Sequence, residues 1–414
     1  MLSSSHDPLY KSVACVILSA TLVLPGCGQR SQSDLASSAL VEVLASPAAS
    51  GSELSRVTSD NEGRVYLSWV DARGGRAELL FAQLRGDTWQ EPESVASGTD
   101  WFLNWADFPA LAVQESAKAV HWLRRSGEGT YDYDILARFY HSEAGEWSEP
   151  IQVNQDQVSA EHGFVSMLPL AQGRTMLSWL DGRYTKSSPT AGPMSLRSAI
   201  FDPLGQAEAE WELDSRVCDC CQTNMALTSN GPVVVYRDRS ASEVRDIAIT
   251  RLLEGRWTMP KTIHEDGWEV QGCPVNGPAV AASGPQVAVA WFTARDDLPQ
   301  VKVAFSSDSG ASFSAPSIVA KGNTNGRVAL AHLSTGDFAV TWIDTSEAGT
   351  TIMLTRFTRN GELIESVPVA KTTASRRSGF PSMVAHQNSV FISWTAVDAS
   401  AYRSQVQVAR VRFP

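Results

Sequence analysis

The sequence contains no run of 18 apolar residues, so no segment has the length that a bilayer-spanning helix needs. Positive charge is also scarce: 34 Lys and Arg stand against 45 Asp and Glu, for a formal net charge of −11. Nucleic acid and anionic lipid surfaces would repel such a chain, so neither is expected as a main partner. The hydrophobic fraction of 43% is ordinary for a globular protein, and closed all-β folds often reach this length as one domain.

The first 26 residues are predicted to be a lipoprotein signal peptide. An apolar stretch from Ser12 to Leu24 follows Lys11 and is too short to span a bilayer. It runs into Leu24-Pro25-Gly26-Cys27, which resembles the lipobox at which bacterial lipoproteins are cleaved and acylated on the cysteine. The alternative is a plain secretory signal in which Cys27 is incidental.

A lipidated Cys27 would anchor the protein to a membrane without spanning it. Gly28 stands where the usual inner-membrane retention signal has Asp, so the cell envelope, and within it the outer membrane, is the expected location. Residues 27–39 are predicted to be the lipidated cysteine and a flexible tether, and residues 40–414 the folded domain.

A strand-like run that ends in an aromatic residue recurs seven times, at intervals of 51–57 residues. A near-constant period above 50, built of strand-like pieces, is typical of β-propeller blades. Each period is predicted to hold four antiparallel strands, A to D, with the aromatic anchor in strand B. The anchors are Trp69, Trp122, Trp179, Tyr236, Trp291, Trp342 and Trp394.

The two ends of the chain are predicted to share one blade. The last repeat ends at Pro414, just after its third strand, while a spare apolar strand, Leu40–Leu44, precedes the first repeat. Docking the spare strand as the missing fourth strand would close the ring and remove the exposed edges. The predicted fold is therefore all-β, a seven-bladed β-propeller of four-stranded antiparallel blades.

The segment from Ser306 to Phe313 (SSDSGASF) resembles the Asp box of the sialidase superfamily. In this turn Asp308 can accept backbone N–H groups, Gly310 can supply a positive φ, and Phe313 can pack under the hairpin. The resemblance implies a structural role for Asp308, because Asp boxes lie on the face opposite the active site. Sialidases have six blades, so a six-bladed ring is the alternative fold.

Four of the six cysteines fall in D–A loops, which join the last strand of one blade to the first strand of the next. Cys218, Cys220 and Cys221 precede the fourth repeat, and Cys273 precedes the fifth. Cys218 and Cys273 each lie 18 residues before their anchors, so the two loops should meet at the mouth of the central channel.

Three hypotheses explain this cysteine cluster: disulfides, a soft-metal site, and a mixed or redox-active use of the thiols. An even number of cysteines in an oxidising compartment favours disulfides: one bridge between the blades, and a second within the Cys218–Cys221 segment. The second is a soft-metal site for copper or zinc, with thiolates from both blades and His162 or His264 as a further ligand.

The B–C loops repeat an Asp two residues after the anchor (Asp71, Asp181) and an Arg four residues after it (Arg73, Arg183, Arg295). Sialidases hold a substrate carboxylate with three arginines from separate blades, because a guanidinium suits a carboxylate. They also use a tyrosine nucleophile. The resemblance therefore gives as catalytic candidates Arg73, Arg183, Arg295 and Tyr402.

The family's Phe/Tyr-Arg-Ile-Pro element, which supplies its first arginine, is missing. The repeated Asp and Arg would alternatively be turn-capping ion pairs. Tyr133 and Tyr184 are further tyrosines on suitable loops, and Trp105 lies in a D–A loop where it could stack on a sugar. The ligand-binding candidates are Asp71, Arg73, Trp105, Asp181, Arg183 and Arg239.

Two functions remain open. One is an envelope-anchored binding protein whose ligand, a glycan or a soft metal, binds at the face of the D–A and B–C loops around the cysteine cluster. The other is an exo-acting glycoside hydrolase of the exo-α-sialidase type. Fold alone does not decide between them, since propellers host many unrelated functions.

Overall fold

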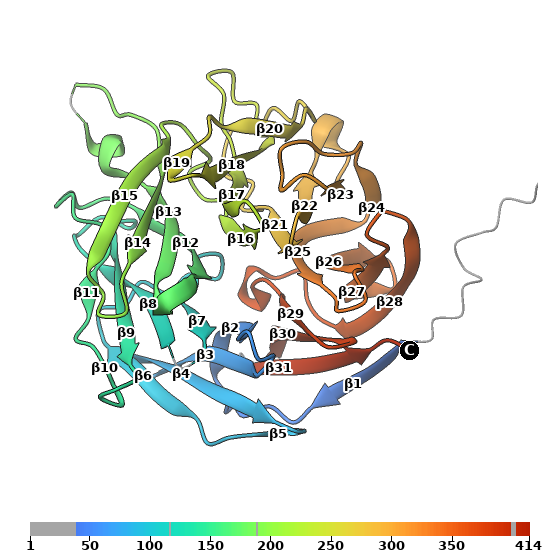
Figure 1. Cartoon of the computed structure of the whole chain (residues 1–414), viewed down its shortest axis with the longest axis horizontal. Helices are drawn as coiled ribbons and strands as arrows, with labels where there is room; N and C mark the ends of the chain where they lie inside the picture. Colours follow the sequence, from blue (N-terminus) through green and yellow to red (C-terminus); the bar gives the residue numbers. More distant parts are fainter. Residues whose placement is uncertain (1–38, 116, 188, 399–402) are drawn as a thin grey trace, which may run out of the picture. The chain divides into compact units, whose positions relative to one another are not determined.

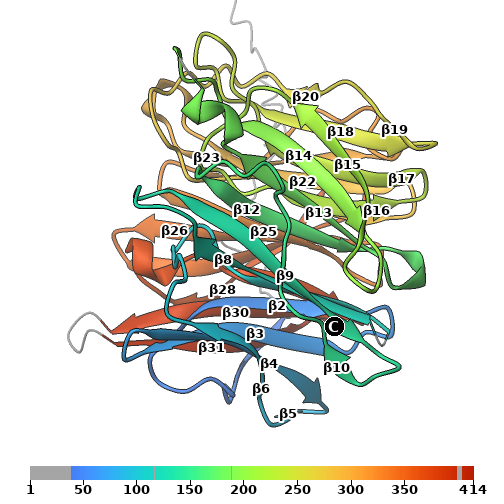
Figure 2. The ribbon, with the colours of Figure 1, turned by 90° about the vertical axis from the view of Figure 1, so that its left-hand side faces the viewer.

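The computed structural model describes residues 39–115, 117–187, 189–398 and 403–414. These residues form seven antiparallel sheets arranged as blades around a central axis (Figure 1). Viewed from the side, the blades lie face to face (Figure 2). The seven-bladed prediction is confirmed and the six-bladed alternative is wrong. No helix among the described residues is long and apolar enough to cross a membrane.

The first three blades follow one another along the chain. Blade 1 comprises β2 (Ser52–Ser59), β3 (Val65–Arg73), β4 (Arg76–Arg85), β5 (Thr88–Trp89) and β6 (Glu93–Gly98). Blade 2 comprises β7 (Ala110–Gln114), β8 (Ala117–Arg125), β9 (Tyr133–His141), β10 (Glu146–Trp147) and β11 (Ile151–Gln152). Blade 3 comprises β12 (His162–Pro169), β13 (Thr175–Asp181), β14 (Ser195–Phe201) and β15 (Ala207–Asp214).

The next three blades repeat the pattern. Blade 4 comprises β16 (Asn224–Thr228), β17 (Gly231–Arg237), β18 (Ile247–Leu253), β19 (Arg256–Trp257) and β20 (Lys261–His264). Blade 5 comprises β21 (Ala279–Ser283), β22 (Gln286–Thr293), β23 (Gln300–Ser306) and β24 (Ser317–Lys321). Blade 6 comprises β25 (Thr324–His332), β26 (Phe338–Ser346), β27 (Gly349–Phe357) and β28 (Leu363–Lys371).

Blade 7 joins the two ends of the described chain. It comprises β29 (Ser382–His386), β30 (Ser389–Asp398), β31 (Arg403–Arg412) and β1 (Leu40–Leu44). The short 3-10 turns are η1 (Ala171–Gly173), η2 (Arg183–Lys186), η3 (Arg295–Asp297) and η4 (Arg376–Ser378).

The second strand of each blade is rich in apolar residues because both faces of its sheet are covered by neighbouring blades. In β22, for example, the seven residues from Val287 to Thr293 are all buried. The anchors Trp69, Trp179 and Trp291 are no more than 2% exposed. The aromatic anchors therefore repeat in the sequence because each one is buried where one blade packs on the next.

Strand β1 closes the ring, as predicted. It pairs antiparallel with β31, Leu40 opposite Arg412 and Leu44 opposite Val408. Arg410 of β31 binds Glu42 of β1 at 2.8 Å and Asp87 of blade 1 at 2.6 Å, so it ties blade 7 to its neighbour. The predicted signal peptide, Cys27 and the tether up to residue 38 lie outside the described residues.

Asp308 has the structural role that the Asp-box resemblance implies. It lies in the turn between β23 and β24, at the end of the propeller opposite the D–A loops, and accepts hydrogen bonds from the Ser312 N–H at 2.9 Å and the Ser306 hydroxyl at 2.8 Å. Burial favours the neutral acid, but the hydrogen bonds from Ser312 and Ser306 outweigh it and lower the pKa of Asp308 to about 2. Gly310 has a φ of +77°, which suits glycine alone without strain.

Alanine variants of a buried and an exposed leucine of β1 test whether this strand seals the ring. Leu44 is 6% exposed and packs between blades 7 and 1, whereas Leu40 is 58% exposed. We expect Leu44→Ala to lower the free energy of unfolding by about 2–4 kcal/mol, since it leaves a cavity in a packed core. Leu40→Ala should change it by less than about 0.5 kcal/mol. Urea unfolding of both variants measures the difference, and equal effects would mean that β1 does not seal the ring.

Candidate functional site

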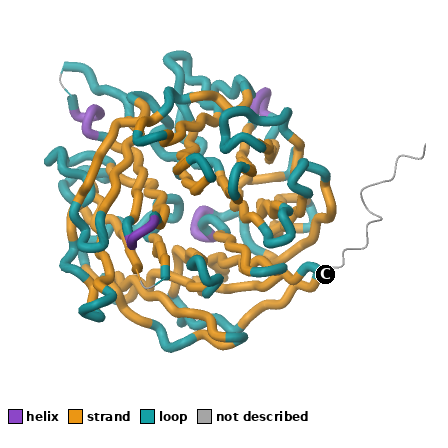
Figure 3. The backbone as a smooth tube through the Cα atoms, in the orientation of Figure 1, coloured by secondary structure: helices purple, strands orange, loops and turns teal. Residues whose placement is uncertain are grey.

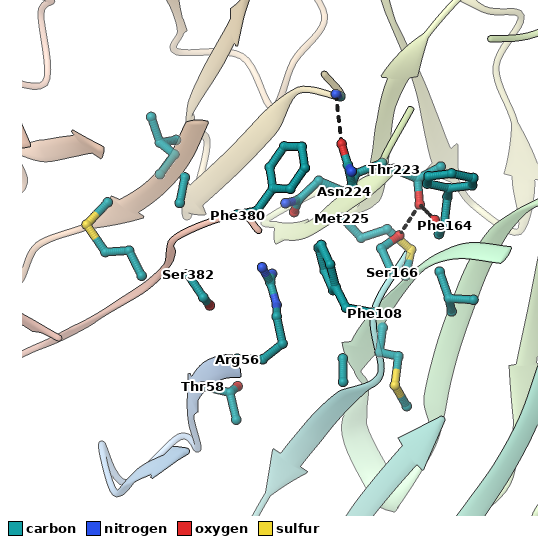
Figure 4. Close-up of a pocket in the computed structure, with 18 of the residues that line it drawn as sticks. Arg56, Thr58, Phe108, Phe164, Ser166, Thr223, Asn224, Met225, Phe380 and Ser382 are labelled. Atoms are coloured by element: carbon teal, nitrogen blue, oxygen red, sulfur yellow. Dashed lines mark hydrogen bonds between the residues drawn. The ribbon is translucent and has the colours of Figure 1, made fainter. Parts of the chain in front are cut away.

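The innermost strands of all seven blades surround a cavity of ≈280 Å³ on the channel axis (Figure 4). At the end where the D–A loops enter, its wall includes Ala106, Gln222, Gly277 and Phe380. Deeper residues come from the middle of the first strands, such as Met167. The cavity therefore lies beneath the face on which the sequence placed a ligand site.

One position in each blade forms a ring around this channel: the residue of the first strand that pairs with the residue just before the anchor. Six of the seven residues at this level are small or of moderate size, and the seventh is an arginine. The ring consists of Arg56, Ala110, Ser166, Asn224, Ala279, Ala329 and Ser382. The small residues leave the space that the Arg56 side chain and the cavity occupy.

Arg56 is a cation without a partner. Its guanidinium carbon lies 4.6 Å from the centre of the Phe108 ring, but its side chain makes no hydrogen bond or ion pair with any described residue. Burial lowers its pKa to about 10, so it stays protonated at neutral pH. The side chain is half-buried on the cavity wall, and an anion entering the cavity would compensate its charge.

Further polar groups face the same cavity. The side chains of Thr58 and Asn224 likewise make no hydrogen bond with the described residues. The hydroxyls of Ser166 and Thr223 lie 2.8 Å apart, and the Ser382 hydroxyl accepts a backbone N–H of blade 1. Thr58 and Asn224 are therefore available to a ligand that binds Arg56, and Figure 4 shows all three side chains around the same pocket.

Trp105, a predicted ligand residue, stands at the entrance. Its ring stacks on Phe380 with centres 5.7 Å apart, and the Arg327 guanidinium lies 4.9 Å from its centre. Trp101, in the same D–A loop, and Trp268, in another one, are only 8% exposed and belong to the core. Of these three tryptophans, Trp105 is the one placed next to the cavity wall.

A buried tyrosine joins two carboxyl groups beside the channel. The Tyr133 hydroxyl lies 2.8 Å from Asp107 and 3.1 Å from Glu161. Burial is the main reason that the pKa rises to about 7 for Asp107 and about 8 for Glu161, and the charge of Asp107 adds to the effect on Glu161. A Cβ at Gly163 would fall 1.9 Å from Asp107, so only glycine fits there.

His162 belongs to an ion-pair network. It is fully buried, its Nε2 atom lies 2.8 Å from Asp156, and the same atom lies 3.7 Å from Asp181. These three side chains are close enough together to hold a metal, but Arg183 already binds Asp181 at 2.7 Å and Asp156 at 3.2 Å. Burial alone would lower the pKa of His162, yet the hydrogen bond to Asp156 and the charge of Asp181 raise it overall.

The four cysteines of the cluster form two disulfides. Cys220 is bonded to Cys273 across the two blades, with Cα atoms 6.0 Å apart, and Cys218 is bonded to Cys221, with Cα atoms 5.8 Å apart. The predicted proximity of the two loops is confirmed, although Cys220 rather than Cys218 makes the bridge. Copper and zinc bind thiolates, so the geometry favours disulfides over a metal in this cluster.

The three periodic arginines hold their own loops. Arg73 donates to the Ser50 carbonyl at 3.2 Å and Arg295 to the Asp266 carbonyl at 3.1 Å. Arg183 binds the D–A loop of blade 3 through Asp156. In each case the arginine of a B–C loop binds the D–A loop that leads into its own blade. This recurring contact favours the turn-capping hypothesis over a shared carboxylate site.

The remaining predicted residues also have partners within the chain. Asp71 binds Arg73 at 2.7 Å. Arg239 binds both oxygens of Asp219, at 2.8 and 2.9 Å, and also binds Glu243. Tyr402 lies outside the described residues. Residues not predicted from the sequence are Arg56, Asp107, Glu161 and Arg327; the signal for Arg56 is its place 13 residues before an anchor, where the other repeats have small or uncharged residues.

No family model and no curated protein matches the sequence. Among solved structures, a protein of unknown function from Dyadobacter fermentans is similar with a TM-score of 0.52 and 12% identity, over 90% of this chain and 98% of that one. A variant of the NanB sialidase from Streptococcus pneumoniae gives 0.45 and 11%, over 87% and 68%. The endosialidase of phage phi92 gives 0.49 and 9%, over 91% and 69%. At such identities the likeness shows the propeller fold alone.

The raised pKa of His162 gives a stability that depends on pH. Because the folded protein binds this proton more tightly than the unfolded chain, whose histidine pKa is about 6.5, the contribution is full below that value. It is lost as pH rises through the folded pKa. We therefore expect His162→Gln to destabilise the protein more at pH 5.5 than at pH 9, measured by urea unfolding.

His264→Gln is the matched control, since His264 is half-exposed and lies 3.6 Å from its nearest carboxylate. Its loss of stability at pH 5.5 should be smaller than that of His162→Gln, because a half-exposed side chain makes weaker contacts in the folded protein. An effect of His162→Gln that is equally large at both pH values would rule out a charged histidine in the network.

Proposed function

We propose that this protein is an envelope-anchored binding protein that holds a small acidic ligand, in particular an acidic sugar, in its central channel. The observation that carries the proposal is the unpaired guanidinium of Arg56 inside the cavity. A guanidinium binds a carboxylate through two parallel hydrogen bonds, and the exchange of a half-buried lone cation for an ion pair favours binding.

The rest of the cavity suits such a ligand. Thr58 and Asn224 offer groups that can bond sugar hydroxyls, while Phe108 and Phe380 supply apolar surface. Its ≈280 Å³ is just below the range of about 300–1,000 Å³ for pockets that bury drug-sized ligands, so it suits a single sugar unit. The lipobox at Cys27 supports attachment to the envelope through acyl chains, with the propeller carried at the end of the tether.

Calorimetric titration with galacturonate, and with neutral galactose as the comparison ligand, tests the proposal. We expect galacturonate alone to bind, and Arg56→Gln to weaken it by about ten- to a hundredfold, as for the loss of a charge-assisted hydrogen bond. The variant should fold at least as stably as the parent, because it removes an uncompensated charge.

Arg73→Gln is the matched control. It removes an arginine of the same blade whose charge is already paired with Asp71, and it should leave the affinity for galacturonate unchanged. Galacturonate binding that survives in Arg56→Gln, or no binding of any acidic sugar by the parent, would refute the channel site.

Glycoside hydrolysis is the second candidate, favoured by the contact between Tyr133 and Glu161. However, Tyr133 is fully buried, and its ring is stacked against Phe102 at 4.0 Å. The three periodic arginines are engaged with their own loops. A nucleophile must reach the sugar, so these contacts favour a structural role for the tyrosine.

We expect no turnover of a fluorogenic sialoside above background. We also expect Tyr133→Phe to lower the free energy of unfolding by about 1–3 kcal/mol, because the two carboxyl groups lose their shared donor. A fluorescence assay and urea unfolding measure the two effects. Turnover by the parent that disappears in Arg73→Ala and Arg183→Ala would replace the binding hypothesis with the hydrolase.

A further inference from the structure

The D–A loop that leads into blade 7 carries positive charge at the channel entrance. Arg376 and Arg377 are exposed, and neither side chain makes a hydrogen bond or ion pair with a described residue. Arg327, beneath them, has no carboxylate partner among the described residues either. Together with Arg56 in the cavity, these residues place four arginines at the channel and its entrance. None of the four forms an ion pair with a described carboxylate, although the net charge of the chain is −11.

The buried Arg327 holds this loop in shape. One of its nitrogens, Nη1, donates to the carbonyls of Ser375 and Gly379 and to the hydroxyl of Ser378, each at 3.0 Å. The Ser375 hydroxyl in turn accepts the N–H of Arg377 at the start of η4. Arg376 and Arg377 are therefore mounted on a fixed turn, so little conformational entropy of the backbone is lost when they bind a ligand.

The loop stands next to the cavity. Phe380, three residues after Arg377, is part of the cavity wall, and η4 lies at the inner edge of the ring (Figure 3). The charge of Arg376 also lowers the pKa of Arg327, after the larger effect of burial, to about 10. The cations at this entrance thus repel one another, and an anion placed among them would relieve that repulsion.

One carboxyl group faces the same loop. Glu53 of β2 is near enough to Arg377 for the arginine's charge to lower its pKa, but burial has the larger effect and raises the pKa overall. Glu53 and Arg377 are not within ion-pair distance. The arginine consequently keeps its charge available to a ligand.

We propose that Arg376 and Arg377 form a second anion subsite, the blade 7 rim, and that the ligand is an acidic oligosaccharide of two or more charged units. This inference rests on the proposed function, in which one carboxylate binds Arg56. The cavity suits a single unit, so the next unit must lie at the entrance, where guanidinium groups suit its carboxylate. Two linked contacts bind more tightly than either alone, because the second becomes intramolecular.

Calorimetry with galacturonate and digalacturonate tests this step on the parent and on the double variant Arg376→Ser/Arg377→Ser. We expect the parent to bind digalacturonate about tenfold or more tightly than galacturonate. The double variant should lose that gain and keep the affinity for galacturonate within about twofold. The gain should also shrink as salt rises, since the rim is exposed.

The double variant Arg85→Ser/Arg256→Ser is the matched control. Both of these arginines are exposed, and they lie at the C–D turns on the opposite end of the propeller, so the control makes the same change in net charge away from the entrance. It should leave both affinities unchanged, and an equal loss in both double variants would mean that overall charge, rather than the rim, attracts the dimer.

The two proposals fail in different ways. If galacturonate binds and Arg56→Gln weakens this binding as expected, but the parent binds digalacturonate no more tightly than galacturonate, the rim is overturned and the channel site stands. If the parent binds digalacturonate more tightly than galacturonate and the Arg376→Ser/Arg377→Ser variant keeps this gain in affinity, the rim is again overturned. If neither sugar binds the parent, the channel site itself is refuted.

Discussion

A ring of sheets is stable only if its last blade seals against its first, and in this protein strand β1 does so by pairing with β31. This one pairing supplies the fourth strand of blade 7 and leaves the ring without an open blade. It also fixes the circumference, because seven anchors of similar size then pack in sequence around the axis. The channel, the level of Arg56 within it and the crowding of the D–A loops at one end all follow from that closure.

Arginines inside this fold differ in whether their guanidinium groups have hydrogen-bond acceptors, and this difference separates structural from functional arginines. Arg237 is almost completely buried, and its guanidinium donates to the backbone carbonyls of Asn276, Arg245 and Phe292. Arg327 likewise donates to a loop that it shapes. Arg56 differs from both: it is half-buried on the wall of the channel, and its guanidinium has no acceptor among the described residues. A partly desolvated charge without a counter-charge favours the binding of an anion, and this contrast is the strongest reason to place a ligand in the channel.

The fold was predictable because blade packing repeats. Anchors, the spare strand Leu40–Leu44 and the Asp-box turn each depend on local sequence or on a constant period. The same period located the two cysteine loops, but it could not choose between Cys218 and Cys220, because the path of the chain within a four-residue turn decides which sulfur points across the blades. The periodic Asp and Arg of the B–C loops were also found, and their regularity is explained by the loop that each arginine clasps.

The channel site was not predictable by the same means, since a site on a propeller axis is made by the position that differs between blades. In the sequence Arg56 differs from the other repeats only as a charged residue 13 positions before an anchor, and the strand pairings are needed to show which six residues share its level in the channel. The Tyr133 cluster combines residues of two D–A loops and a strand, and the separations between these residues follow no motif or period in the sequence. The loop of Arg376 and Arg377 is held at the entrance by Arg327, which lies 49 and 50 residues earlier in the sequence. In this propeller, therefore, repetition marks what holds the ring together, and the departures from it mark where a ligand would bind.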